Sequence, residues 1–123
     1  MARRFERRLA LTGEPALIHC AAGKDRTGLV VGLLLDAVSV RREAIAEDYA
    51  LSSVCLGPEY VAESQEWVAR RGLDWIRWQH VFETPPERMH KTLDFVDQQF
   101  GGVQAYLIRQ GFQPLISRPS ERC

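Results

Sequence analysis

Most of the chain consists of stretches in which apolar residues recur at helical spacing, and this pattern predicts a mostly helical protein. The longest apolar run, GLVVGLLLDAVSV at residues 28–40, is too long for one strand and too short to span a bilayer. We therefore predict a buried helix that begins near Thr27. Two further helices are predicted over residues 41–53 and 59–72, and the Gly-Pro pair at 57–58 separates them.

The next predicted helix is recognised by its start signals. Thr84 is a good N-cap, Pro85 fits the first helical turn and Glu87 completes the spacing of a capping box. Two consecutive glycines at 101–102 are expected to end this helix. A last short helix is predicted over residues 103–110.

One short segment has the pattern of a strand instead. The apolar run ALIH at residues 16–19 follows the turn residues TGEP, as a buried strand would, and leads directly into Cys20. A lone strand leaves its backbone donors and acceptors unpaired. We therefore expect the partner strands to lie upstream of Met1 or in a second copy of the chain. The prediction is one domain over residues 1–123 that is incomplete at its N-terminus or forms a homodimer.

The residues that could carry chemistry lie in the segment HCAAGKDRTG, from His19 to Gly28. A loop that curls at a helix N-terminus points successive N–H groups at one centre, where they favour a bound dianion. The same field stabilises a thiolate, so Cys20 is predicted to be a nucleophile near neutral pH. The planar guanidinium of Arg26 can hold two phosphate oxygens and stabilise the charge of a transition state.

Other residues of this segment have predicted supporting roles. The Thr27 hydroxyl is placed to hydrogen-bond the Cys20 sulfur and to help it leave from a phospho-cysteine intermediate. His19 is predicted either to order the loop from behind or to be an ordinary half-buried histidine. The residues predicted to bind substrate are Ala21, Ala22, Gly23, Lys24, Asp25 and Arg26.

Charge and cysteine content narrow the class of protein. The 16 basic residues balance the 16 acidic residues, so no net charge favours nucleic acid or a membrane surface. The three cysteines lack C-x-x-C spacing, and His80 and His90 have no nearby ligand set, so neither a disulfide framework nor a metal site is predicted.

Residues 1–11 are arginine-rich without the apolar region of a secretion signal. We predict an amphipathic helix there and a cytoplasmic location without stable membrane insertion.

The segment HCAAGKDRTG resembles the signature of the cysteine-dependent tyrosine and lipid phosphatase superfamily, and its Lys24-Asp25 pair resembles the bacterial tyrosine/serine or phosphoinositide phosphatase branch. Three later segments are also similar to that branch: REAIAEDYALS, TPPERMHKTLDFVDQQFGGVQAYL and RQGF. The resemblance implies an α/β fold with a central parallel sheet flanked by helices. It also implies a phospho-cysteine mechanism without metal or other cofactor, acting on a phosphorylated protein or a phosphoinositide.

The resemblance also implies that the reaction uses a general acid. Many relatives take this acid from an aspartate on a loop before the signature, and no such loop precedes Leu17 in this chain. Asp25 is the remaining carboxylate within the segment, so it is predicted to be the acid/base group or, equally, a residue that structures the loop.

Two alternatives remain open at the level of sequence. The chain is expected to be a phosphatase, with a truncated and inactive anion-binding module as the other interpretation. Pocket depth would decide between phosphotyrosine, phosphoserine and phosphoinositide, and the sequence does not reveal it. The tryptophans at 67, 75 and 78 lie where the similar branch has a helical lid, but we favour a role in packing for them.

Overall fold

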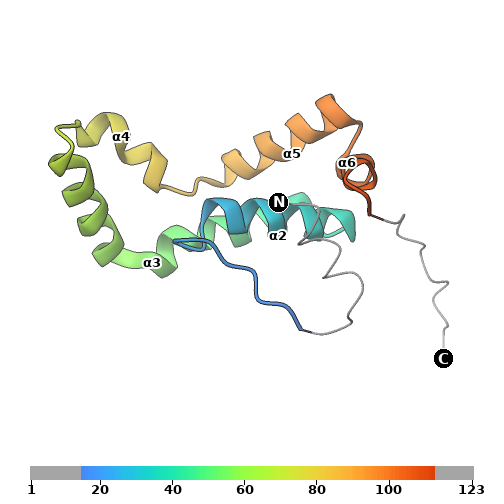
Figure 1. The fold of residues 1–123 in the computed structure, drawn as a ribbon, viewed down its shortest axis with the longest axis horizontal. Coiled ribbons are helices and arrows are strands. Elements are labelled where there is room, and N and C mark those ends of the chain that lie inside the picture. The colour runs from blue at the N-terminus through green and yellow to red at the C-terminus, as the bar shows by residue number, and fades with distance from the viewer. Residues whose placement is uncertain (1–14, 113–123) are drawn as a thin grey trace.

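The computed structural model describes residues 15–112, and its regular elements are helices (Figure 1). In chain order they are α2 (Asp25–Ala37), α3 (Arg42–Arg70), α4 (Trp75–Phe82), α5 (Pro86–Phe100) and α6 (Val103–Arg109). None of these helices has the length and apolar character needed to cross a membrane. The amphipathic helix predicted over residues 1–11 lies outside the described residues.

The prediction of an α/β fold with a parallel sheet is wrong for the part of the chain that the structure describes. Residues 15–112 contain no strand, and the segment 16–19 has no regular secondary structure. Leu17, predicted to be buried, is 83% exposed. A strand forms only where a neighbouring strand accepts and donates its backbone hydrogen bonds, and no described segment offers such an edge to this one.

The hydrophobic core lies where α2 and the first half of α3 pack against α5 and α6. Figure 1 shows α2 and the start of α3 running side by side, with α5 alongside and α6 at one end. Ile45 and Leu93 are among the most deeply buried side chains. The buried cluster comprises Ala37, Ile45, Ala46, Tyr49, Met89, Leu93, Val96, Val103 and Leu107.

The break predicted at Gly57 is confirmed as a kink within α3. Gly57 has φ 70° and ψ −170°, a backbone conformation that is readily available only to glycine, and Pro58 follows it. After the kink, the second half of α3 turns away from α2 and leads into α4 (Figure 1). These two segments pack against each other as a helical hairpin.

Aromatic side chains fill the hairpin formed by α3 and α4. The Phe82 ring stacks on Trp75 at 5.8 Å between ring centroids, and Trp67 meets it edge-on at 6.0 Å. Tyr60 also approaches Phe82 edge-on, at 6.4 Å. We call Tyr60, Trp67, Trp75 and Phe82 the aromatic cluster, and offset or edge-on contacts of this kind stabilise a small helical unit.

The helix predicted after Thr84 is confirmed, but the predicted cap is wrong. The N-cap of α5 is Pro85, and no side chain caps this end. The Thr84 hydroxyl instead lies 2.6 Å from the Ser53 hydroxyl and donates to the Ala50 carbonyl at 3.2 Å. Thr84 is buried, so its polar groups need these partners. They attach the start of α5 to α3.

Candidate active site

The Cys20 loop, which comprises residues 20–26, joins the irregular N-terminal segment to α2. Its turn depends on Gly23, whose φ of 67° lies in the left-handed region that disfavours a side chain. After this turn α2 begins at Asp25, two residues before the predicted start. The first turn of α2 then brings the Thr27 hydroxyl back to the loop, where it donates a hydrogen bond to the Cys20 sulfur at 3.1 Å.

The environment of Cys20 favours the thiolate. The Thr27 hydroxyl and the backbone N–H of the same residue lower the pKa of Cys20 to about 6, and the N–H groups of Lys24 and Gly23 contribute in the same direction. These groups donate to the sulfur and stabilise its charged form more than its neutral form. A thiol of this kind is mostly ionised, and therefore nucleophilic, at neutral pH.

Cys20 opens into a pocket of about 190 Å³ that combines the loop with the hairpin of α3 and α4. The lining residues are Cys20, Ala21, Ala22, Lys24, Asp25, Arg26, Tyr60, Val81 and Phe82. The structure therefore places most of the sequence-predicted site residues around one hollow. Tyr60, Val81 and Phe82 were missed by the sequence analysis because they lie about 40 to 60 residues further along the chain, where no motif marks them.

Arg26 is exposed at the rim of this pocket. Within residues 15–112 it forms no ion pair, so its guanidinium is free to bind an anion beside the sulfur. His19 is also exposed and lies outside the residues that line the pocket. Its predicted role in ordering the loop stays a prediction.

Lys24 is directed into the protein, although it belongs to the same loop. Its side chain is 3% exposed, and its Nζ donates to the Val81 carbonyl at 2.9 Å. The same Nζ pairs with Asp25 Oδ2 at 2.8 Å. A buried ammonium requires partners of this kind. Lys24 thereby connects the Cys20 loop to the end of α4.

The second oxygen of Asp25 is also engaged. The Tyr49 hydroxyl of α3 donates to Asp25 Oδ1 at 3.1 Å, and burial raises the pKa of Tyr49, so this hydroxyl keeps its proton. The Tyr49 ring lies tightly against Gly28 of α2, where a Cβ atom would come within 2.8 Å of it. Close approach of α2 and α3 therefore fixes the position of the hydroxyl.

Arg88 completes this set of contacts. Its Nη1 donates to the Tyr49 hydroxyl at 3.3 Å and lies 4.0 Å from Asp25 Oδ1. No motif in the sequence marks Arg88 or Tyr49 as part of the site. Tyr49 belongs to the helix predicted over residues 41–53, and no spacing relates either residue to the Cys20 loop.

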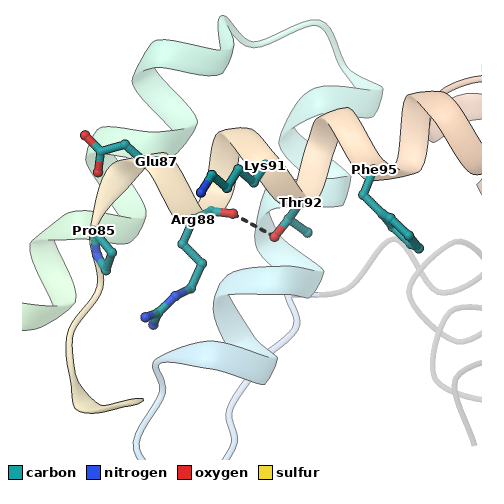
Figure 2. Close-up of a pocket in the computed structure, with 6 residues that line it drawn as sticks. All are labelled: Pro85, Glu87, Arg88, Lys91, Thr92 and Phe95. Atoms are coloured by element: carbon teal, nitrogen blue, oxygen red, sulfur yellow. Dashed lines mark hydrogen bonds between the residues drawn. The ribbon is translucent and has the colours of Figure 1, made fainter. Parts of the chain in front are cut away.

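A larger pocket of about 450 Å³ lies along α5, as Figure 2 shows. Its lining residues are Pro85, Glu87, Arg88, Lys91, Thr92 and Phe95. It contains no cysteine and no residue of the Cys20 loop. We therefore place the chemistry in the smaller pocket, where the thiolate lies.

Comparison with known proteins agrees with the loop geometry. A family model described as the tyrosine phosphatase family matches residues 1–115. The chain belongs to the tyrosine phosphatase family. The resemblance inferred from HCAAGKDRTG is thereby confirmed, and no solved structure gives a significant match.

Curated relatives of this tyrosine phosphatase family member are bacterial. The triple specificity protein phosphatase PtpB of Mycobacterium tuberculosis is 44% identical over 63 residues, which are 51% of this chain and 22% of the relative. A tyrosine-protein phosphatase of Nostoc commune is 47% identical over 49 residues, 40% of this chain and 17% of the relative. The chain thus spans about a fifth of the length of these two proteins.

Proposed function

We propose that this chain carries the nucleophile of a phosphatase that hydrolyses phosphate monoesters through a phospho-cysteine intermediate. The observation that carries the proposal is the hydrogen bond from Thr27 to the Cys20 sulfur at the start of α2. Together with the loop N–H groups, it supplies an ionised nucleophile where a helix N-terminus attracts a dianion. Membership of the tyrosine phosphatase family supports the same chemistry.

In the first step, the Cys20 thiolate attacks phosphorus, and the bond between phosphorus and the ester oxygen breaks. The electron pair of that bond goes to the oxygen of the leaving alcohol, which takes up a proton from water. Arg26 holds two non-bridging oxygens with its guanidinium, and the N–H groups of residues 21–26 surround the others. Such fixed donors stabilise the charge that spreads over the equatorial oxygens in the transition state.

In the second step, water attacks phosphorus, and the bond between phosphorus and sulfur breaks. The sulfur leaves as a thiolate, and the Thr27 hydroxyl stabilises it through the same hydrogen bond as in the free protein. Inorganic phosphate is the product. One donor therefore assists both attack by sulfur and its departure.

Asp25 is our proposed acid/base group. It lines the pocket with Cys20, and both of its carboxylate oxygens accept contacts, from Lys24 and from Tyr49. These contacts fix the carboxylate beside Cys20, and we propose that it accepts a proton from the attacking water in the second step. The alternative prediction, that Asp25 only structures the loop, is distinguished by Asp25→Asn, which would then alter stability and leave the pH profile of turnover unchanged.

The walls of the pocket favour an aryl phosphate. Tyr60, Val81 and Phe82 offer aromatic and apolar surface above the loop. An inositol ring would present hydroxyls and further phosphates to that surface, and the Lys24 ammonium is already bonded within the protein. We therefore propose a phosphotyrosine side chain of a protein as the preferred substrate over phosphoserine and phosphoinositides.

A cytoplasmic location and a homodimer complete the proposal. A reducing compartment protects a thiolate of low pKa from oxidation, which supports the location.

Leu17 and Leu29 are exposed apolar side chains on either side of the Cys20 loop, and a second copy of the chain could cover them. Sedimentation of the purified chain tests the dimer directly.

The decisive experiment is hydrolysis of 4-nitrophenyl phosphate by the purified chain without added metal, compared with the Cys20→Ser and Arg26→Ala variants. Turnover that both variants abolish would support the proposal. Arg70→Ala is a matched control, because among residues 15–112 Arg70 pairs only with Glu66, on the outside of α3. A folded chain that binds phosphate but gives no turnover would contradict the proposal and favour the anion-binding alternative.

A further inference from the structure

Two cations from distant parts of the chain bind the same end of α4. Lys24 of the Cys20 loop donates to the Val81 carbonyl at 2.9 Å. Arg88 of α5 donates from Nη2 to the His80 carbonyl at 2.6 Å and from Nη1 to the Glu83 carbonyl at 2.5 Å. The last carbonyls of a helix receive no hydrogen bond from within the helix, so they need donors from elsewhere in the protein. Lys24 and Arg88 supply these donors from two directions.

Both cations also approach Asp25. Lys24 Nζ lies 2.8 Å from Asp25 Oδ2, and Arg88 Nη1 lies 4.0 Å from Asp25 Oδ1. The Tyr49 hydroxyl lies between Arg88 and the carboxylate, accepting from the former and donating to the latter. The carboxylate thus offsets the repulsion between two cations that would otherwise share one end of a helix.

The end of α4 matters because it forms a wall of the active-site pocket. Val81 and Phe82 line the hollow above Cys20, and Phe82 is the centre of the aromatic cluster. Figure 2 shows the Arg88 side chain extending from α5 on the side opposite to Glu87. Arg88 contacts α4 through the His80 carbonyl and also contacts Tyr49, but it does not line the Cys20 pocket itself.

We propose that Arg88 is a positioning residue: it holds the end of α4 and the Asp25 carboxylate so that the α4 wall stays fixed over the Cys20 loop. The role of Arg88 in catalysis rests on the proposed phosphatase function. Its role in holding the pocket wall can be tested without measuring turnover. The guanidinium is suited to the role because its fork reaches the two carbonyls and the Tyr49 hydroxyl together, which an ammonium does not do.

The kinetic test is Arg88→Met assayed with 4-nitrophenyl phosphate. A displaced wall weakens binding of the aryl group, so we expect KM to rise about tenfold while kcat changes about twofold. Arg88→Lys should restore only part of the loss, since it keeps the charge without the fork. A fall in kcat with unchanged KM would overturn the assignment of Arg88 to the binding wall.

The second test needs only the thiol. Iodoacetamide and a bulky fluorescein iodoacetamide are reacted with the protein, and alkylation of Cys20 is followed by peptide mass spectrometry. A fixed wall hinders the bulky reagent more than the small one. In Arg88→Met we expect the ratio of bulky to small rates at Cys20 to rise about fivefold, as local opening exposes the sulfur. Cys55 is exposed on α3 and serves as an internal control whose ratio stays constant.

Tyr49→Phe provides a variant that keeps the ring against Gly28 and removes only the hydroxyl between Arg88 and Asp25. It should shift the alkylation ratio at Cys20 in the same direction as Arg88→Met. This variant also carries the test if Arg88→Met loses its helical circular dichroism. An unchanged ratio at Cys20 in a folded Tyr49→Phe or Arg88→Met protein would overturn the proposal, whether or not the chain hydrolyses phosphate esters.

Discussion

The Thr27 hydroxyl donates a hydrogen bond to the Cys20 sulfur across 3.1 Å, and this bond is the largest single cause of the low pKa of that thiol. The two residues are seven positions apart in sequence, yet the turn at Gly23 and the first turn of α2 bring them together. The low pKa of the Cys20 thiol therefore depends chiefly on the loop and the first turn of α2.

Removing this hydroxyl should raise the pKa of Cys20. In Thr27→Ala the thiolate loses its strongest donor, and a hydrogen bond to a charged group corresponds to about one to two pKa units. The rate of iodoacetamide alkylation at Cys20, measured against pH, should show its midpoint move up by that amount from about 6. Thr27→Ser keeps a hydroxyl and should leave the midpoint near its original position. Equal midpoints in Thr27→Ala and the unmodified chain would show that the backbone donors suffice.

The pH dependence of turnover follows from the same thiol. In the proposed mechanism Cys20 attacks as the thiolate, so kcat/KM for 4-nitrophenyl phosphate should rise as pH increases through about 6 and then level off. Below that pH the sulfur is protonated, and kcat/KM should fall about tenfold for each pH unit. The substrate phosphate also ionises in the acidic range, and its contribution is separated by repeating the profile with Thr27→Ala. A profile that does not move in this variant would assign the rise to the substrate.

The proximity of the candidate site residues was more predictable than the fold because it depends on local sequence. Cys20, Thr27 and Arg26 fall within one loop and one helix start, where spacing alone places them near a common centre. The strand predicted at 16–19 was wrong because four apolar residues do not reveal whether a neighbouring strand exists. Whether an apolar run is buried depends on the rest of the fold, and Leu17 is exposed.

For a similar reason, the sequence pattern did not predict contacts between residues that are far apart in the chain. Arg88 and Lys24 meet at the end of α4 only because α3 kinks and returns the chain through a helical hairpin. The kink itself was predicted from the Gly57-Pro58 pair, but its direction depends on packing of the aromatic cluster. Thr84 is a similar case. The sequence around it fits an N-cap, but its buried side chain forms hydrogen bonds to α3 instead.

Two glycines of α2 offer a matched pair of substitutions. A Cβ at Gly28 would lie 2.8 Å from the Tyr49 ring, while a Cβ at Gly32 would lie 2.9 Å from the sulfur of Met89. The aromatic ring is rigid, but the end of a methionine side chain can move aside. Gly28→Ala should therefore lower the free energy of unfolding by about 1–3 kcal/mol, and Gly32→Ala by less.

Urea denaturation followed by circular dichroism measures both changes, and alkylation of Cys20 adds a functional difference between them. Displacing Tyr49 moves its hydroxyl away from Asp25, so Gly28→Ala should also raise the ratio of bulky to small reagent rates. Gly32→Ala does not touch that network and should keep the original ratio. A larger loss of stability in Gly32→Ala would mean that α2 and α5 adjust less readily than α2 and α3.

Arg42 links three helices, and the pH dependence of this link has a definite sign. Its guanidinium donates to Asp36 at the end of α2 at 2.9 Å and to Asp97 of α5 at 2.7 Å. The hydrogen bond from Arg42 holds the pKa of Asp97 below its ordinary value. A carboxylate with a lowered pKa in the folded protein stabilises the fold above its unfolded pKa, and this contribution is lost as pH falls through the folded value.

Asp97→Asn should therefore lower the free energy of unfolding at pH 7 and have progressively less effect as pH falls below about 4. Asp97 is 43% exposed, so solvent screens the pair and the expected loss is about 1 kcal/mol at most. Added salt should reduce it further. Asp94→Asn is the matched control, because this neighbouring carboxylate lies 3.5 Å from Arg42 without accepting a hydrogen bond and is 65% exposed. Thermal unfolding at pH 7 and pH 3 compares the variants, and an equal effect of Asp97→Asn at both values would assign its contribution to packing instead of charge.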